Sequence, residues 1–434
     1  MTPELAGIIG IFVLLFCLFF LGMPVGFSMA VVGFFGFAQS ISFEAAMGMI
    51  SADLWDTFSN YGLTAIPLFV FMGYLAYYSG IAEKLYKTAY TWFGSWRGGL
   101  AIATIGADEL FAAICGSNTA TAATMGAIAL PQMKKYAYDP RLSSGTVATG
   151  GTLGSVMPPS VILIIIGLQT EQSIIELFLA GILPAAILGL LFVLTIVVLC
   201  RLHPAYGPAG PKTGWMEKIV SLKGLVDAVA IFALVIGGLY LGMFTPTEAG
   251  AAGVFLTLLV TVPRRKIGVK DFLSSIKDTI KVSCMAFVLV TGAIIFGRFM
   301  AVTRIPFELA EFAANLPVSN YLILLVVLTI YFIGGCFVDA LGFLVLTIPI
   351  FFPLGMALGF DPVWFAIILT MVTTMGAITP PVGVNIYVVK ALAMEISIAT
   401  IYKSASYFLL ACFVCIIILT LFPSIVLFLP GIMR

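Results

Sequence analysis

Two double prolines, each inside a long apolar run, constrain the fold of this chain more than any other feature. Pro158-Pro159 and Pro380-Pro381 lie 222 residues apart. Neither pair can continue a helix, because proline lacks an amide donor and its ring clashes with the preceding turn. Each run is therefore predicted to be a broken transmembrane helix with free backbone groups at membrane depth. Such breaks persist only where protein or a water-filled cavity satisfies those groups.

Further matches at the same spacing indicate an internal duplication. The matching positions are Pro24 with Pro246, Ala30 with Ala252, Ser117 with Asp339, Pro131 with Pro353, Gly154 with Gly376 and, at an offset of 224, Ile81 with Ile305 and Leu85 with Leu309. Duplicated halves that each carry a broken helix are typical of secondary transporters. One double proline alone could be a simple kink, whereas two at equivalent positions favour a functional break.

The composition predicts an all-α polytopic membrane protein. Hydrophobic residues make up 61% of the chain and charged residues 9%, and the mean hydropathy is +1.15. Soluble domains contain about 25% charged residues. The net charge of +1 implies no nucleic-acid partner, and the single histidine, His203, leaves no histidine-based metal cluster or catalytic pair. We therefore expect neither an enzyme nor a cofactor.

A helical span needs about 20 apolar residues, and this length predicts five crossings in each half. The first repeat, 1–200, has expected spans at 5–21, 24–40, 63–80 and 176–200 and a broken helix at 143–170. The second repeat, 223–434, has expected spans at 223–242, 246–262, 282–300 and 404–430 and a broken helix at 361–390. Residues 201–222 are expected to form a cytoplasmic linker, and 303–319 an interfacial helix. The pair 5–21 and 24–40 could instead be one kinked helix.

Each half also contains an apolar segment that is expected to be a re-entrant helical hairpin. The first, 103–133, is interrupted by the polar stretch at Gly116–Asn118, and Arg97 and Lys134 flank it with charges of one sign. Such flanks suggest that the segment enters and leaves on the same side. The second hairpin is expected at 321–356, with its tip at 338–342.

The distribution of basic residues predicts the orientation. An odd number of crossings per half inverts the second repeat relative to the first. With the N-terminus outside, the inside loops hold 18 of the 21 Lys and Arg residues, Arg264, Arg265 and Lys266 among them, whereas Arg304 and Arg434 lie outside and Arg298 lies within a span. This bias follows the positive-inside rule, so one hairpin is expected to open to each side.

The broken elements predict where a substrate and a coupling ion bind. A helix that ends inside the membrane presents amide donors at its N-terminus, which suit a carboxylate, and carbonyls at its C-terminus, which suit a cation. Without a buried row of acids for a proton relay, sodium is the expected coupling ion. The candidate sodium ligands are Ser117, Asn118, Thr119, Gly154, Met157, Asp339, Gly376 and Thr379. The candidate substrate-binding residues are Ser117, Asn118, Thr119, Ser155, Pro159, Ser160, Asp339, Pro381 and Asn385.

Three of these interpretations have structural alternatives. The stretch Gly116–Thr121 could simply pack helices together, as small and polar residues do in membranes. Asp339 could bind a ligand, as acids at membrane depth often do, or cap the second arm of its hairpin. Arg298 could pair with an anionic substrate, but its place near the outer end of a span favours snorkelling.

Four motifs together resemble one family over essentially the whole chain. They are Gly116–Ala123 with Leu130–Met133, Leu153–Ser160, Gly242–Ala249 and Ile378–Asn385. With these residues the chain resembles the large membrane subunit of the tripartite ATP-independent periplasmic (TRAP) transporters.

The resemblance implies an elevator-type sodium symporter of the bacterial inner membrane that imports an organic acid, such as a C4-dicarboxylate or a sialic acid. It also implies two partners: a soluble periplasmic substrate-binding protein, and a small four-span membrane subunit expected as a separate chain. The two hairpins and the two broken helices would form the moving transport domain, with sodium between each hairpin tip and its broken helix. A stand-alone sodium/dicarboxylate symporter of similar architecture is the alternative. A membrane enzyme would need a metal cluster or a nucleophile–base pair, for which the sequence offers no intramembrane histidine and few acids, and a channel would be favoured by downhill flux without sodium dependence.

Overall fold

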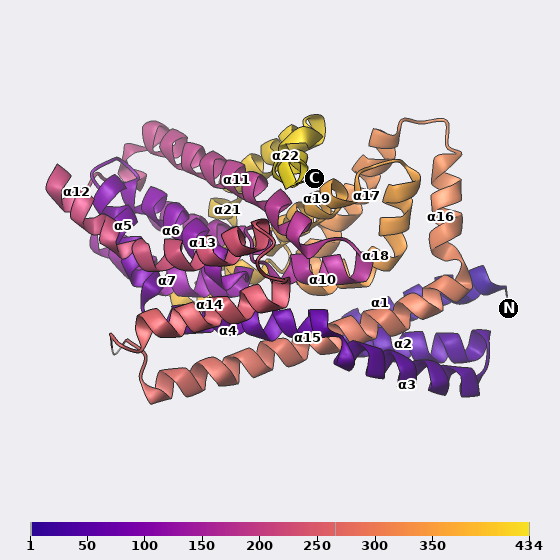
Figure 1. Ribbon diagram of the computed structural model, residues 1–434. Coiled ribbons are helices and arrows are strands. Elements are labelled where there is room, and N and C mark those ends of the chain that lie inside the picture. Colours follow the sequence, from indigo (N-terminus) through magenta and orange to yellow (C-terminus); the bar gives the residue numbers. More distant parts are fainter. Residues whose placement is uncertain (1, 265, 434) are drawn as a thin grey trace.

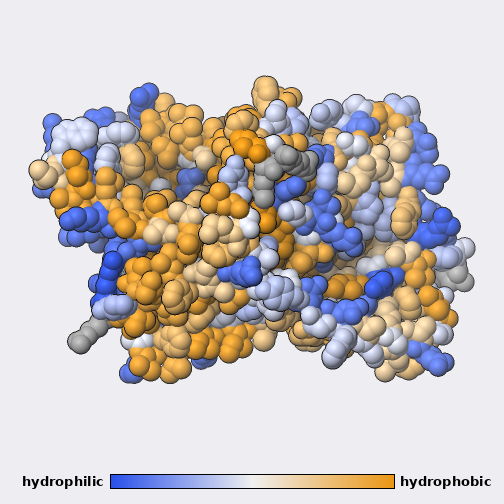
Figure 2. All heavy atoms as spheres, viewed as in Figure 1, coloured by the Kyte–Doolittle hydropathy of each residue, from blue (hydrophilic) through white to orange (hydrophobic). Residues whose placement is uncertain are grey.

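The computed structural model describes residues 2–264 and 266–433, and within these residues every regular element is a helix. Arg265 and Arg434, which enter the charge count above, lie outside the described residues. Seven of the described helical segments are long and apolar enough to cross a membrane, and a bent pair at 215–240 would add an eighth. Hydrophobic residues cover much of the face in Figure 2, and hydrophilic residues gather toward its left and right edges.

The described residues of the first half form eleven α-helices, most of which are labelled in Figure 1. They are α1 (Pro3–Phe19), α2 (Val25–Ser40), α3 (Phe43–Ser59), α4 (Ala65–Tyr78), α5 (Ile81–Phe93), α6 (Gly99–Cys115), α7 (Asn118–Lys135), α8 (Pro140–Gly150), α9 (Leu153–Val156), α10 (Val161–Thr170) and α11 (Ile174–Leu202). A short 3₁₀ turn, η1 (Tyr61–Thr64), precedes α4, and η2 (Pro204–Tyr206) follows α11. The two arms of the first hairpin are α6 and α7, and the first broken helix is the run α8–α10.

The second half repeats this order of elements. Its helices are α12 (Trp215–Ser221), η3 (Leu222–Gly224), α13 (Val226–Tyr240), α14 (Pro246–Thr261), α15 (Val269–Thr303), α16 (Ile305–Ala314), α17 (Asn320–Phe337), α18 (Ala340–Ala357), α19 (Pro362–Met375), η4 (Gly376–Ile378), α20 (Val384–Leu392), α21 (Ile398–Leu421) and α22 (Pro423–Met433). The arms of the second hairpin are α17 and α18. The second broken helix is α19, η4 and α20.

Contacts between the halves occur in exchanged pairs, as a two-fold relation requires. Helix α2 packs on α15, and its counterpart α14 packs on α4. In the same way α10 packs on α18 while α20 packs on α7, and α21 packs on α8 while α11 packs on α19. In Figure 1, α15 runs along the lower edge of the molecule, and it packs on α4. The chain is therefore built from two inverted repeats that interlock.

The same capping chemistry begins the broken helix in both halves. Asp139 precedes Pro140 and accepts a hydrogen bond from the amide of Arg141 at 2.7 Å. Asp361 precedes Pro362 and accepts from the amides of Val363 and Trp364 at 2.9 and 3.0 Å. Proline suits a first helical position because no partner is needed for its missing amide. The Asp-Pro pairs are thus a further sign of the duplication.

Several segments differ from the expected spans. Residues 41–62, expected as a loop, form α3, which is capped by Ser42 and packs on α2 and α15. The expected span 404–430 is divided after Leu421, because Pro423 cannot continue α21. Residues 5–40 form two helices separated at Gly22, which has a positive φ of 63°. Helix α15 extends far beyond the expected span 282–300 and begins at Val269.

Arg298 pairs with a residue of the protein. Its guanidinium lies 3.3 Å from the Asp53 carboxylate of α3, and that carboxylate is buried. The second Asp53 oxygen, Oδ2, has no hydrogen-bond partner among the described residues. Arg298 therefore ties α15 to α3, and it does not line the cavity described below.

Replacing Arg298 should destabilise this contact. We expect Arg298→Gln to lower the free energy of unfolding by about 1 kcal/mol, because it leaves a buried carboxylate without its cation, while the exposure of Arg298 limits the loss. Thermal unfolding in detergent measures the change, with Lys87→Gln as a matched control on an exposed side chain. Equal stability of both variants would contradict a stabilising role for the pair.

Candidate functional site

The first hairpin tip lies directly against the first helix break. Helix α6 ends at Cys115, its C-cap Gly116 has a left-handed φ of 61°, and α7 begins after the extended residue Ser117. A methyl group built on Gly116 would lie 2.1 Å from the carbonyl oxygen of Pro159. A methyl group on Gly154 would lie 2.6 Å from the carbonyl oxygen of Ser117. The backbones of the hairpin tip and the helix break are therefore in direct contact here, and only glycine allows so close an approach.

Side-chain hydrogen bonds join the same two elements. The Ser155 hydroxyl donates to Oδ1 of Asn118, which links the break to the first turn of α7. The Ser160 hydroxyl donates to the Ser155 carbonyl at 2.6 Å and accepts from the amide of Leu163 at 3.4 Å, so it caps α10. Met157 lies in extended backbone between α9 and the double proline. Hydrogen bonds of its own polar groups therefore stabilise the non-helical conformation of the break.

The second tip meets the second break in a similar way. A methyl group on Gly376 would lie 2.0 Å from the carbonyl carbon of Gly335, near the end of α17. The amide of Val382 donates to the carbonyl of Cys336 at 3.2 Å, which joins the break to the hairpin. Thr379 donates its hydroxyl to the Met375 carbonyl at 2.8 Å. The repeats therefore place the same kind of contact at both hairpins.

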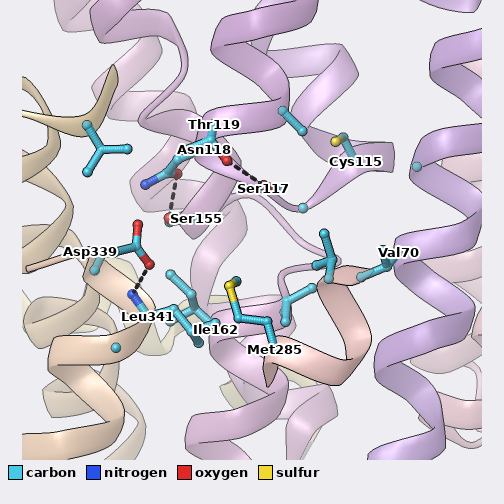
Figure 3. A pocket seen from close by; sticks show the side chains of 18 of the residues that line it. Val70, Cys115, Ser117, Asn118, Thr119, Ser155, Ile162, Met285, Asp339 and Leu341 are labelled. Atoms are coloured by element: carbon cyan, nitrogen blue, oxygen red, sulfur yellow. Dashed lines mark hydrogen bonds between the residues drawn. The ribbon is translucent and has the colours of Figure 1, made fainter. Parts of the chain in front are cut away.

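Asp339 is the N-cap of α18. Its carboxylate accepts a hydrogen bond from the amide of Leu341 at 3.2 Å, as Figure 3 shows. The capping alternative is therefore confirmed for this residue. The tip of the second hairpin nevertheless lines the same cavity as the first, so the cap does not remove Asp339 from the candidate site.

A cavity of about 1010 Å³ lies between the two tips and the helices α2, α4 and α15. Figure 3 places Asn118, Ser155 and Asp339 around it, with Met285 of α15 on another side. Its walls also include the N-terminal residues of α2, α7, α18 and α20. Because helix N-termini carry partial positive charge, this arrangement suits an anionic group.

The cavity brings together only some of the predicted site residues. Those that line it are Ser117, Asn118, Thr119, Ser155 and Asp339. The others do not line it and are Gly154, Met157, Pro159, Ser160, Gly376, Thr379, Pro381 and Asn385. Most of these lie behind the tips, in the contacts between each hairpin and its helix break. Pro381 differs, because it is exposed and its carbonyl accepts a hydrogen bond from the Tyr402 hydroxyl at 3.0 Å.

Asn385 joins the two halves. Its side-chain amide donates to the Ala148 carbonyl of α8 at 3.0 Å, and the residue is completely buried. Its Oδ1 atom has no hydrogen-bond partner among the described residues, and neither has the hydroxyl of the buried Thr121. These two oxygens are unpartnered acceptors of the kind that a sodium ion uses. The Ser117 carbonyl close to Gly154 already accepts a hydrogen bond from the amide of Thr121 at 3.0 Å.

The sequence did not predict the residues of α4 and α15 that line the cavity opposite the hairpin tips. The Tyr78 hydroxyl of α4 donates to Asp278 of α15 at 2.8 Å, and both residues line the cavity with Tyr74 and Tyr77. Neither lysine nor arginine is among the described residues that line it. The tyrosine pattern in 74–78 was the available signal, but only the packing of α4 on α15 brings these tyrosines to Asp278.

Comparisons with known proteins place these features in one family. The model described as "Tripartite ATP-independent periplasmic transporter, DctM component" matches residues 12–425. The C4-dicarboxylate TRAP transporter large permease protein DctM of Pseudomonas aeruginosa is 33% identical over 383 residues, covering 88% of this chain and 89% of that protein. The sialic acid TRAP transporter large permease protein SiaM of Vibrio cholerae is 29% identical over 414 residues, covering 95% and 96%.

A solved structure has a similar fold. The crystal structure of the YdaH transporter of Alcanivorax borkumensis superposes with a TM-score of 0.62, covering 88% of this chain and 89% of that one. The two sequences are 15% identical, so the likeness concerns the fold alone. The relatives above are named as permeases, which are transport proteins and not enzymes.

Proposed function

Because the chain belongs to the DctM-component family of tripartite ATP-independent periplasmic transporters, we propose that it is the transport subunit of a sodium-coupled symporter for an organic acid. The substrate is a carboxylate of the class for which the relatives are named, such as a C4-dicarboxylate or a sialic acid. The subunit works with a soluble periplasmic binding protein and a small four-span membrane subunit. It lies in the bacterial inner membrane with a periplasmic N-terminus.

One observation carries the proposal: both hairpin tips line a single large cavity and are packed on helix breaks through glycine contacts. A carboxylate in this cavity meets the amides of the helix N-termini, which substitute for the absent Lys and Arg side chains. Specificity for a carboxylate therefore needs no cationic side chain at the tips.

Sodium occupies the contacts behind the tips. The candidate ligands are backbone and side-chain oxygens, the kind of ligand that hard cations prefer. At the first site the carbonyls of Ser117, Gly154 and Met157 combine with the Asn118 side chain. At the second, the carbonyl of Gly376 combines with Thr379 and with Asp339 at the tip. Sodium binding draws each break toward its tip and so builds the carboxylate site beside it.

The hairpins and broken helices move together as an elevator. They are held to each other by the exchanged pairs α10 with α18 and α20 with α7. The cavity lies between the tips and the helices α2, α4 and α15, which form the fixed wall. The hairpins also touch this wall, where Gly73 of α4 lies beside Cys115 and Val25 of α2 lies beside Gly342. Movement along that wall carries the substrate from one side of the membrane to the other.

Uptake into proteoliposomes tests the proposal. The chain, reconstituted with its small subunit, should accumulate the substrate only when both a sodium gradient and loaded binding protein are present. Equal uptake without the binding protein would favour the stand-alone symporter. Downhill flux without any sodium dependence would favour a channel.

Single ligand removals test the sodium sites. We expect Asn118→Ala and Thr379→Ala each to raise the sodium concentration for half-maximal uptake by about tenfold, since one oxygen ligand contributes roughly 1.4 kcal/mol. Thr329→Ala is the matched control, because Thr329 makes the same hydroxyl-to-carbonyl bond within a helix but is exposed. An unchanged sodium activation curve for both site variants would remove these positions from the proposal.

A further inference from the structure

Asp108 is a completely buried acid without a partner. It lies in α6, the first arm of the first hairpin, and its exposed fraction is 0%. Neither carboxyl oxygen makes a hydrogen bond to any described residue. A methyl group built on Gly150 of α8 would lie 1.9 Å from Oδ2 of Asp108. Glycine at this position therefore makes room for the carboxyl group inside the hairpin and broken-helix assembly.

The surroundings of Asp108 offer it no cation. Tyr86 of α5 interacts electrostatically with Asp108, and the Tyr86 hydroxyl is also buried without a hydrogen-bond partner in the described part of the chain. On its own helix the next residue is Glu109, which points to Gly189 of α11. The other titratable or charged groups on the helices packed against α6 include Tyr74, Tyr77 and Tyr78 of α4, Glu83, Lys84, Lys87 and Tyr90 of α5, Lys134 and Lys135 of α7, Arg141 of α8, Glu176 and Arg201 of α11, and Asp227 and Tyr240 of α13. No ion pair joins any of them to Asp108 among the described residues.

Burial decides which ligand this carboxyl group can hold. An ionised carboxylate taken out of water without a partner costs several kcal/mol or more, whereas a neutral carboxyl group costs far less. A metal ion would need space and further ligands. Asp108 lines neither of the two cavities described for this chain, and no cluster of three His, Cys, Asp or Glu occurs within 2–264 and 266–433. A proton needs no space and no further ligand.

We propose that Asp108 is a proton-binding site within the transport domain, and that its proton is exchanged with the cytoplasm during the transport cycle. The coupling of this proton to substrate uptake rests on the proposed transport function, whereas the binding of the proton to Asp108 does not. When the proton binds, one carboxylate oxygen gains an O–H bond and the negative charge disappears. When the proton leaves, that bond breaks and water accepts the proton.

A row of tyrosine hydroxyls offers the path. Tyr86 is within electrostatic range of Asp108, Tyr138 and Tyr90. Tyr90 neighbours Tyr136, at 6.0 Å between ring centroids, and Tyr136 is partly exposed at the end of α7. Because the Tyr86 hydroxyl makes no hydrogen bond among the described residues, a proton passes along the row only when rotation of the hydroxyls or an entering water molecule joins them, each hydroxyl donating its hydrogen to one neighbour and accepting another.

Infrared spectroscopy of the purified full-length chain tests proton binding directly. The wild-type protein should have the carbonyl-stretch band of a protonated carboxyl group in a dry environment, and Asp108→Asn should lack it. Glu109→Gln, the matched control at the adjacent acid, should retain it. A band that persists unchanged in Asp108→Asn would overturn the proposal. If Asp108→Asn does not fold, Asp108→Ser removes the carboxyl group with less volume and gives the same test.

Uptake by the reconstituted complex tests the coupling. At a fixed sodium gradient and membrane potential, an inward proton gradient should accelerate wild-type uptake and leave Asp108→Asn uptake unchanged. Tyr86→Phe should slow the response while the infrared band remains. A wild-type rate that does not respond to the proton gradient would refute the coupling, even where sodium-driven uptake proceeds normally. Loss of all sodium-driven uptake in the wild type would instead count against the proposed function.

Discussion

Gly116→Ala is expected to reduce uptake by at least about thirtyfold while the protein still inserts into the membrane. The residue has a left-handed φ of 61°, which costs a side chain roughly 1–2 kcal/mol. Its new methyl group would lie 2.1 Å from the Pro159 carbonyl oxygen, and relief of that clash costs a further 1–3 kcal/mol or so. Together these costs disfavour the contact between tip and break by about 2 kcal/mol or more, and about 1.4 kcal/mol corresponds to a tenfold change.

The control for this variant lies on α6, the helix that Gly116 caps. Gly106→Ala adds a methyl group to α6 where nothing lies within 4 Å, so it should leave uptake within about twofold of the wild type. Uptake is measured in proteoliposomes and membrane insertion by the yield of folded protein. Wild-type uptake by Gly116→Ala would mean that the tip does not have to approach the break during transport.

The sequence was sufficient to predict the local breaks, because their causes are local. Proline lacks an amide donor in any context, so Pro158-Pro159 and Pro380-Pro381 interrupt their helices wherever they fold. The spacing of 222 residues then related the two halves without any knowledge of packing. The polar stretch that begins at Gly116 predicted a tip for the same kind of reason, since glycine readily ends a helix in left-handed conformation.

Contacts between distant segments could not be predicted in this way. The sequence did not indicate that the side-chain amide of Asn385 reaches the Ala148 carbonyl, 237 residues earlier in the chain. Asp278 was expected in an inside loop, whereas α15 continues through it and brings it to Tyr78. Asp108 was overlooked because its burial depends on the glycine at position 150 of a different helix. Local patterns do not report which helices pack together.

The duplicated sites are similar in backbone but differ in exposure. Pro158 and Pro159 are buried, whereas Pro380 and Pro381 are exposed. Helix α10 is capped by the Ser160 side chain, whereas α20 begins after Gly383 with a φ of 57° and no side-chain cap. The first tip therefore has more polar side chains bound to its break than the second. At the second site the close approach of glycine backbones contributes a larger share of the contact.

Gly376→Ala is therefore expected to impair sodium binding at the proposed second sodium site more than removal of the Thr379 hydroxyl does. A methyl group there would lie 2.0 Å from the Gly335 carbonyl carbon, which is backbone and cannot rotate away. Such overpacking costs about 1–3 kcal/mol, so the sodium concentration for half-maximal uptake should rise roughly ten- to hundredfold. Gly297→Ala is the control, because its methyl group would meet only Pro349 side-chain atoms at an ordinary 3.6 Å. An unchanged sodium requirement in Gly376→Ala would show that α17 and η4 can separate without loss of the ion, and the second contact would then be structural only.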